Sequence, residues 1–293
     1  MIFLLGSIVL SSYLTLAFKF CERYHIDIFQ AIVFNYIFCV ITGSIVNGSF
    51  PVTMQSFSDT WVQWGCAMGV LFIGLFNLIG ITTQKSGVAV ATVANKLSLA
   101  IPVLLAVYLY GEVLVGLKLL GIGVALLAVA LTCYQPAKNK EVNGLKSGGL
   151  QYLLPVVLFI GSGLLDSVIN HVQKNYITDE NSNAFLITGF FSAACIGSLI
   201  LLIQLFSGKK KFSFSNLLAG VLIGIPNYFS IWFLMKFLKI SPLQSSAKIP
   251  VNNMGIVLFS SVVAWLLFRE KLSMINWAGI LLSIAAIALI AFG

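Results

Sequence analysis

The chain has 293 residues, of which 59% are apolar and only 9% are charged, and its formal net charge is +8. A water-soluble domain of this size needs more charged residues on its surface. The composition therefore excludes a protein whose main solvent is water. Most lysines and arginines lie in short segments between apolar blocks rather than on one amphipathic face. The positive charge therefore indicates membrane topology and no nucleic-acid partner.

The apolar residues gather in blocks of roughly 18 to 25 residues, which is the length that crosses a ~30 Å hydrocarbon core as a helix. The blocks are apolar all round, whereas the strands of a transmembrane barrel alternate, so a barrel is excluded. The sequence predicts an all-α membrane protein with ten transmembrane helices. In chain order the blocks are residues 2–18, 28–46, 61–83, 87–109, 115–134, 150–171, 184–206, 216–235, 241–268 and 273–292.

A polar stretch at mid-chain, residues 135–149, is predicted to link two repeats. The first repeat then covers residues 1–134 and the second covers residues 150–293. Each would contain five helices. Because five is an odd number, the second repeat enters the membrane from the opposite side, which makes the two five-helix repeats inverted. Inverted repeats suit alternating access, since exchanging the conformations of the two halves moves the opening from one side to the other.

Short motifs support this repeat. The segment from Gly69 to Asn77 is similar to the segment from Gly220 to Asn227, which aligns the third and eighth helices. The ends of the fourth and ninth helices also correspond, with Tyr110-Gly111-Glu112 matching Phe268-Arg269-Glu270.

Two lysines lie deep in predicted helices. Lys96 is about nine residues into the fourth block, or ~13 Å along a helix, and Lys248 is about seven residues into the ninth. A lysine at that depth costs roughly 2.5 to 3.5 kcal/mol, so it should face the bundle interior or a watery cavity. Either each lysine pairs with a carboxylate or a helix-end carbonyl, or it contacts substrate. Asp166 is the only acid well inside a predicted helix, so a bound anion would supply the missing negative charge.

Asp166 itself has three interpretations: a carboxylate that couples transport to protons, a counter-ion to Lys96 or Lys248, or a group near a helix end that meets headgroup water. Around Lys248, the residues Gln244 and Asn252 stand four positions before and after it, so all three share one helix face. We expect this face to line a cavity.

Other polar residues are candidates for the same cavity. Asn77 and Asn227 hold equivalent places in the two halves, and each either bonds across helices as an amide or lines the cavity. Tyr228 follows Asn227, while Ser12 and Lys19 share a looser polar face of the first helix. The predicted substrate site comprises Lys96, Lys248, Asn77, Asn227, Gln244, Asn252, Tyr228 and Ser12, with Asp166 as a coupling group or counter-ion.

Several polar residues point to no chemistry. Glu112 and Glu270 fall in tight turns at helix ends, where we expect them to be structural. The five cysteines lie in or beside apolar blocks without C-x-x-C spacing, so no metal site and no cofactor are expected. Neither histidine lies deep in a helix, and one buried acid is too little for an enzyme, so no catalytic residue is assigned.

These motifs carry a family resemblance. The run from Lys96 to Pro102, the Tyr110-Gly111-Glu112 turn, the glycine-rich run from Gly121 and the second copy around Glu270 together resemble the drug/metabolite transporter superfamily, in its EamA-type branch. The resemblance implies ten helices in two inverted repeats, a central cavity, and export or exchange of metabolites. Members that recognise anions have lysines in the fourth or ninth helix region, similar to Lys96 and Lys248.

The sequence therefore predicts a secondary active transporter or exchanger of a small anionic or zwitterionic metabolite, working by alternating access in a bacterial inner membrane. Its expected partners are the small-molecule substrate, the lipid bilayer and a coupling proton or counter-substrate. The alternative is a proton-coupled exporter of cationic drugs or amino-acid-like metabolites that uses Asp166. Loop charges predict that both termini lie outside, whereas the family resemblance implies cytoplasmic termini.

Overall fold

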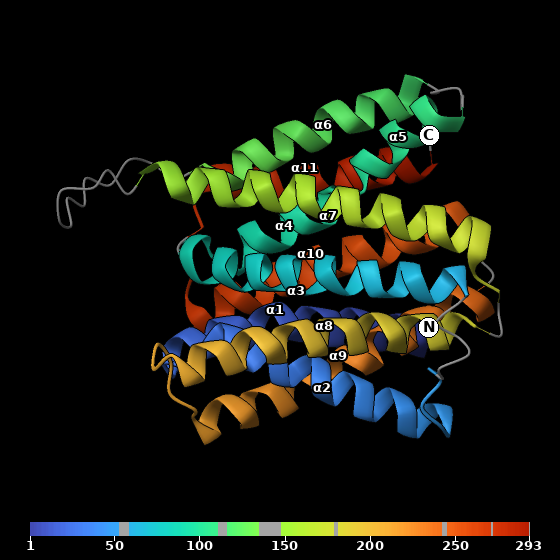
Figure 1. Ribbon diagram of the computed structural model, residues 1–293. Helices are drawn as coiled ribbons and strands as arrows, with labels where there is room; N and C mark the ends of the chain where they lie inside the picture. Colours follow the sequence, from blue (N-terminus) through green and yellow to red (C-terminus); the bar gives the residue numbers. More distant parts are fainter. Residues whose placement is uncertain are drawn as a thin grey trace. The chain divides into compact units, whose positions relative to one another are not determined.

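The structure of the chain is a computed structural model that describes residues 1–52, 59–110, 116–134, 148–178, 181–241, 245–270 and 272–292 (Figure 1). These described residues form helices and no strand, which confirms the all-α class. The helices are α1 (Ile2–Arg23), α2 (Ile28–Asn47), α3 (Thr60–Ser86), α4 (Val88–Leu97), α5 (Ala100–Tyr110), α6 (Gly116–Cys133), α7 (Gly148–Tyr176), α8 (Ser182–Phe206), α9 (Phe214–Ile240), α10 (Ser245–Phe268) and α11 (Met274–Phe292).

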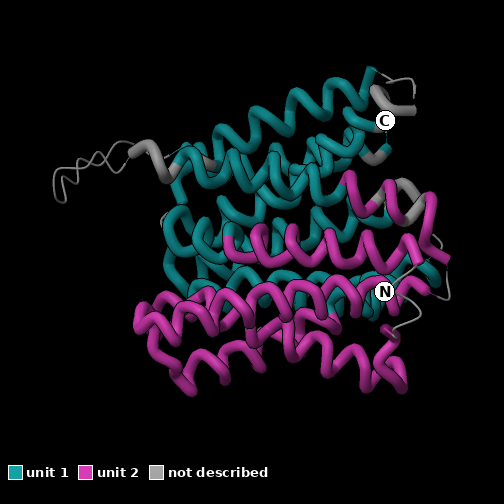
Figure 2. The backbone as a smooth tube through the Cα atoms, viewed as in Figure 1, with its two compact units in different colours: residues 1–19, 78–166, 230–293 teal, residues 20–77, 167–229 magenta. Residues whose placement is uncertain are grey.

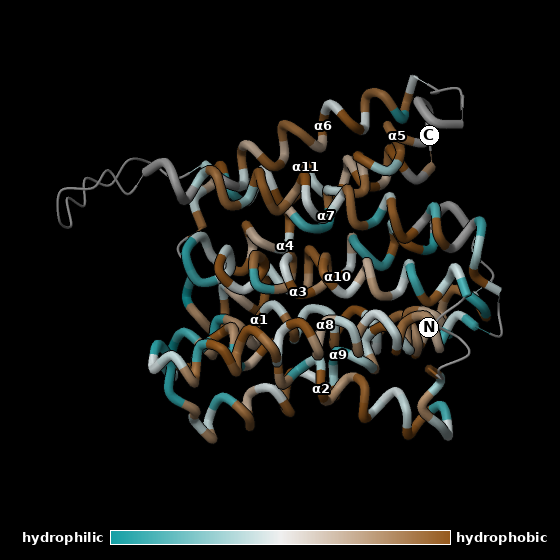
Figure 3. The backbone as a smooth tube through the Cα atoms, in the orientation of Figure 1, coloured by the Kyte–Doolittle hydropathy of each residue, from teal (hydrophilic) through white to brown (hydrophobic). Residues whose placement is uncertain are grey.

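Eight segments of the described chain are long and apolar enough to cross a membrane, and α4 with the start of α5 counts as one of them. The helices α6 and α11 are apolar but shorter. Hydrophobic residues run along the length of the helices, and hydrophilic residues gather toward the helix ends and loops (Figure 3). Large apolar side chains are also exposed, as on a surface that faces lipid: Leu119 is 58% exposed, Leu199 62% and Leu281 61%. The chain is a multi-pass membrane protein, and its ten crossings stay a prediction.

The structure corrects the predicted helix at residues 87–109, which is broken between α4 and α5. Pro102 has no backbone N–H, so it cannot donate to the carbonyl of Ser98 as a continuous α-helix requires. The Ser98 carbonyl instead accepts from the N–H of Ile101 at 2.9 Å, which closes a tighter turn. Pro102 thus accounts for the missing α-helical bond at the break, although Pro155, Pro226 and Pro250 stand inside continuous helices.

Contacts divide the chain into two compact units, which we describe separately (Figure 2). Unit 1 comprises residues 1–19, 78–166 and 230–293, and unit 2 comprises residues 20–77 and 167–229. Each unit takes segments from both predicted repeats. The predicted linker at 135–149 lies outside the described residues except at its last two positions.

Three pairs of helices that hold equivalent places in the two predicted repeats pack against one another. In unit 1, α4 packs on α10 and α6 packs on α11, while in unit 2 α2 packs on α8. The core of unit 1 gathers small and branched side chains from these helices, among them Ala94, Ala125, Val257 and Ile287. Such pairing is what two equivalent halves would produce, and the repeat and its inversion stay predictions.

The α6 and α11 pair is held at close range by two glycines. A Cβ atom at Gly121 would lie 2.9 Å from the side chains of Leu289 and Ile290. A Cβ atom at Gly279, on the facing helix, would lie 2.6 Å from the backbone nitrogen of Thr132. Small residues let helix backbones approach closely in a membrane, where van der Waals packing drives helix association.

Gly121→Leu is expected to destabilise the protein by about 1 to 3 kcal/mol, because the new side chain overpacks this contact. The matched control is Gly123→Leu in the same helix, where a Cβ atom would meet nothing within 4 Å. Both changes gain the same helix propensity, so the difference between their thermal unfolding curves in detergent isolates the clash. Equal unfolding temperatures for the two variants would contradict the packing described here.

Candidate functional site

Lys96 lies in the last turn of α4, immediately before the break between α4 and α5. Its side chain is half-buried, and no hydrogen bond to its ammonium group exists within the described part of the chain. The carbonyls at the end of a helix lack partners in the next turn and carry a partial negative charge. The helix break therefore places one cation and several polar backbone groups at the same point of unit 1.

Asp166 of α7 faces this break. Its carboxylate interacts electrostatically with the Lys96 ammonium. The hydroxyl of Ser98, in the turn between α4 and α5, lies 3.4 Å from the Asp166 carboxylate oxygen Oδ2. Ser98 is completely buried. An ammonium and a carboxylate thus lie within electrostatic reach of one another at a discontinuous helix, an arrangement that suits a ligand with an anionic group or with groups of both charges.

A close approach of α7 to α5 fixes Asp166 beside the break. At Gly163, a Cβ atom would lie 2.4 Å from the Ile101 side chain. Gly163 precedes Asp166 by three positions, so both residues lie on the same face of α7. The absence of a side chain at Gly163 lets α7 bring the carboxylate to the turn that carries Ser98.

Lys248 is committed to a different contact. Its side chain is 9% exposed, and its ammonium donates a hydrogen bond of 2.5 Å to the carbonyl of Leu238. Because α9 ends at Ile240, this carbonyl is one of the last four of the helix, which have no partner within it. The contact matches one of the two interpretations given above for a deep lysine, the pairing with a helix-end carbonyl.

The other residues predicted around Lys248 differ in what the structure shows. Asn252, one turn further along α10, is 2% exposed, and its carbonyl oxygen Oδ1 has no hydrogen-bond partner in the described structure. A buried amide oxygen without a partner is uncommon and suits a site where a ligand or water donates. Gln244 lies outside the described residues.

Ser12 connects α1 to α10. Its buried hydroxyl donates to the carbonyl of Ile256 at 3.4 Å. The two helices meet closely here, because a Cβ atom at Gly255 would lie 2.2 Å from the Ile8 side chain. In this conformation Ser12 makes a contact between helices of unit 1.

Three predicted residues belong to unit 2, where they bond to the protein itself. Asn77 donates to the carbonyl of Ile73 in its own helix at 2.7 Å. Asn227 donates to the side-chain oxygen of Asn35 at 3.0 Å, in a buried contact between α9 and α2. The Tyr228 hydroxyl donates to Asn183 at 3.3 Å. Asn227 and Tyr228 thus tie helices together, as expected of polar residues inside a membrane bundle.

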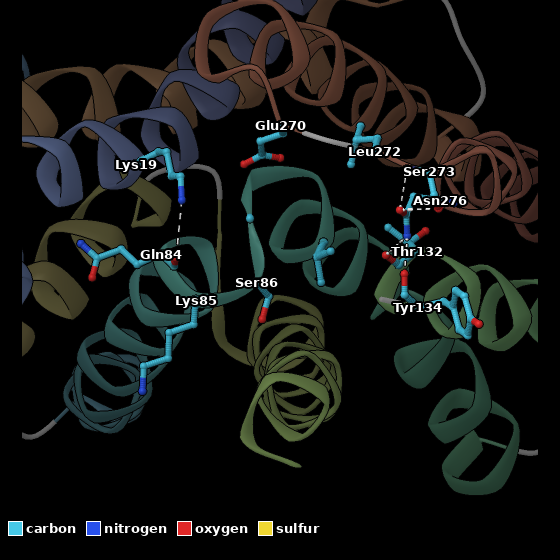
Figure 4. A pocket seen from close by; sticks show the side chains of 12 residues that line it. Lys19, Gln84, Lys85, Ser86, Thr132, Tyr134, Glu270, Leu272, Ser273 and Asn276 are labelled. Atoms are coloured by element: carbon cyan, nitrogen blue, oxygen red, sulfur yellow. Dashed lines mark hydrogen bonds between the residues drawn. The ribbon is translucent and has the colours of Figure 1, made fainter. Parts of the chain in front are cut away.

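A cavity of about 300 Å³ opens at the other end of α4 (Figure 4). Its lining comes from the ends of α1, α3 and α6 and from the connection between α10 and α11. The lining residues are Lys19, Gln84, Lys85, Ser86, Gly87, Val90, Thr132, Tyr134, Glu270, Leu272, Ser273 and Asn276.

Glu270 closes the start of α4 within this cavity. Its carboxylate accepts a hydrogen bond of 2.8 Å from the N–H of Val88, the first residue of α4. A carboxylate at a helix N-terminus satisfies an otherwise free donor and is favoured by the helix dipole. Gly87 has a φ of 99°, which only glycine adopts readily, and a Cβ there would lie 3.1 Å from Glu270. Glu270 therefore has the structural role that its turn position predicted.

The cavity was missed by sequence reasoning, although Lys19 and Glu270 had been singled out. Glu270 and its partner Val88 are 182 residues apart. Asn276 donates to the carbonyls of Thr132 and Tyr134 at 2.9 and 2.8 Å, and these residues are 144 and 142 positions away along the chain. No local sequence pattern reports such contacts.

Comparisons with known proteins agree with this architecture. Residues 153–292 match the model of the EamA-like transporter family. A protein of Haemophilus influenzae (strain ATCC 51907 / DSM 11121 / KW20 / Rd), described as uncharacterized, is 26% identical over 289 residues, which cover 97% of this chain and 95% of the relative. A crystal structure of a protein superimposes with a TM-score of 0.60 at 16% identity, covering 99% of this chain and 96% of that chain, and shows the fold alone.

Proposed function

We propose that this chain carries a small anionic or zwitterionic metabolite across a bacterial inner membrane. It belongs to the EamA-like transporter family of the drug/metabolite transporter superfamily, whose model matches residues 153–292. The family makes the chain a membrane transporter of small molecules. The substrate class and the mechanism are our own inference. Both rest on the charged groups at the break between α4 and α5.

The observation that carries the proposal is the Lys96 ammonium, which has no hydrogen-bond partner in the described structure. A lysine inside a membrane protein is costly unless something compensates for its charge. The Asp166 carboxylate supplies part of that compensation. A carboxylate or a similar anionic group of a substrate would accept a hydrogen bond from Lys96 and supply the rest of the charge compensation.

Lys96 is a better substrate contact than Lys248. Lys248 already donates to the Leu238 carbonyl, so it would have to give up that bond to hold a ligand. With Lys248 committed, the charges available at the break are one ammonium and one carboxylate. A zwitterion would satisfy both groups, whereas a substrate with two negative charges would meet Asp166 as an unfavourable neighbour.

Alternating access is supported by the broken helix and by the packing of helices that hold equivalent places in the two predicted repeats. Transporters built from inverted repeats bind substrate near the bilayer midplane at discontinuous helices. The ten residues of α4 span about 15 Å at 1.5 Å per residue, close to half of a ~30 Å hydrocarbon core. With the cavity at one end of α4 and Lys96 at the other, we place the cavity on the access route. The family match at residues 153–292 supports a second repeat at residues 150–293.

A second candidate function is proton-coupled export of cationic or amino-acid-like compounds. It is favoured by the position of Asp166, whose half-buried carboxylate faces the break next to Ser98. A carboxylate at such a place can bind a cation or carry a proton in exchange. The two functions differ in the protein group that binds the substrate: the Lys96 ammonium in the first and the Asp166 carboxylate in the second.

The test is a transport screen with the purified full chain in liposomes. Three matched solutes are compared: a monocarboxylate, the α-amino acid with the same carbon skeleton, and the corresponding primary amine. We expect counterflow of the carboxylate or the amino acid and none of the amine. Transport of the amine alone, driven by a proton gradient, would replace this proposal with the second candidate.

A further inference from the structure

The connection between α8 and α9 carries a short basic and aromatic segment. It runs from Phe206, the last residue of α8, to Phe214, the first residue of α9, and includes Lys209, Lys210 and Lys211. Both helices are long and apolar enough to cross a membrane. A segment that joins two membrane-crossing helices lies at a membrane surface, among lipid headgroups. We call residues 206–214 the basic loop.

Two of the three lysines are free to bind a partner outside the protein. Lys210 forms an ion pair with Asp27, the residue that caps the start of α2. Lys209 and Lys211 are exposed, and neither ammonium has a partner in the described structure. The basic loop thus offers two positive charges, two positions apart in the sequence, that no ion pair among the described residues neutralises.

The backbone of the basic loop is held in place. Gly208 has a φ of 70°, and its N–H donates to the carbonyl of Leu205 at 3.1 Å, which ends α8 in a tight turn. The carbonyl of Lys211 accepts a hydrogen bond of 3.0 Å from the Gln30 side chain. Gln30 also accepts from the Asn216 amide at 2.9 Å. These bonds hold the backbone from which Lys209 and Lys211 project.

Three phenylalanines border the lysines, and their exposure would be unfavourable if they faced water. Phe206 is 89% exposed, Phe212 is 56% exposed and Phe214 is 70% exposed. At a membrane surface, phenylalanine side chains bury at the boundary between headgroups and acyl chains. Lysines at the same level contact lipid phosphates, so the loop combines the two chemistries of a phospholipid.

We propose that the basic loop binds the headgroup of an anionic phospholipid, with Lys209 and Lys211 on the phosphate and the three phenylalanines against the upper acyl chains. The proposal is independent of the substrate site, which lies in unit 1, whereas the basic loop belongs to unit 2. The Lys210 and Asp27 pair joins the bound lipid to the start of α2. The site would therefore anchor this end of unit 2 to an anionic leaflet.

The test titrates the full chain in detergent with phosphatidylglycerol and measures bound lipid by native mass spectrometry. Each lysine near an anionic lipid strengthens binding by about fivefold, so K209Q/K211Q is expected to bind about 25-fold more weakly than wild type. The control K118Q/K236Q removes the same charge from α6 and α9 and is expected to stay within about twofold. Phosphatidylcholine and glycerol 3-phosphate are expected to show no measurable binding to wild type or to either double variant.

Circular dichroism verifies that both double variants stay folded, which the exposure of Lys209 and Lys211 leads us to expect. The proposal is overturned if K209Q/K211Q binds phosphatidylglycerol like wild type. It is also overturned if the control loses as much affinity, since net charge alone would then explain binding. Equal binding of phosphatidylcholine would leave no role for the lipid charge, and binding of glycerol 3-phosphate would identify a phosphate site in place of a lipid site.

Discussion

Lys96→Met is expected to raise the apparent KM for a carboxylate substrate by about 10- to 150-fold in proteoliposome uptake. A hydrogen bond to a charged group contributes roughly 1.5 to 3 kcal/mol, and each 1.4 kcal/mol is a factor of ten in affinity. Methionine keeps the apolar length of the side chain in the last turn of α4, so the change removes the charge with little loss of packing. It also leaves the half-buried Asp166 carboxylate without its counter-charge, so the thermal stability should fall, as in the converse change at Asp166.

The control for this prediction is Lys248→Met. Because Lys248 donates to the Leu238 carbonyl, its loss is expected to lower the unfolding temperature while the apparent KM stays within about threefold. Lys96→Arg keeps the positive charge but replaces the compact ammonium with a planar guanidinium group, so it should retain part of the transport. A Lys96→Met protein that transports every tested anion like wild type, beside an inactive but folded Lys248→Met protein, would move the anion site to Lys248.

Asp166→Asn is expected to separate two substrates by at least tenfold. Asparagine keeps the shape and the contact with Ser98 but carries no charge, so it cannot pair with the ammonium group of an α-amino acid. Uptake of the amino acid should fall, while uptake of the matching monocarboxylate is retained or increases because Lys96 has lost its competing counter-ion. Parallel uptake assays of both solutes measure the ratio.

Thermal unfolding of the same variants provides a second measure. Asp166→Asn should be less stable than wild type, because it leaves the Lys96 ammonium without a counter-charge, and the added change Lys96→Met should restore stability. If instead Asp166→Asn abolishes proton-driven efflux of cations and Lys96→Met changes nothing, the proton-coupled export function is correct.

Much of the fold follows from sequence because a membrane imposes a strong local rule. Every backbone polar group in the hydrocarbon core must bond within its own segment, so a block of apolar residues of sufficient length has to be a helix. The structural helices accordingly overlap the predicted blocks throughout the described chain. The same rule marks Lys96 and Asp166 as unusual, because charge at that depth is costly wherever the helix packs.

The missed features depend on residues far apart in sequence or on a single backbone bond. Pro102 was visible in the sequence, yet a proline alone does not tell a kink from a break, since Pro155, Pro226 and Pro250 stand inside continuous helices. The α6 and α11 contact depends on Gly121 and Gly279 facing the other helix, which periodicity alone does not reveal. For Asn227 the sequence allowed either a bond across helices or a place in the cavity, and its bond to Asn35 matches the first.

By itself, then, the sequence determined the helical class, the membrane environment and the two charged residues at the break, since these depend on composition and on short-range backbone chemistry. Tertiary structure alone decided the partners of those residues. It joined Lys248 to Leu238 and Glu270 to the start of α4, and it left Lys96 with Asp166 at an open helix end. The physical reason is that a hydrogen bond or an ion pair acts over a few ångströms in space, whatever the distance along the chain.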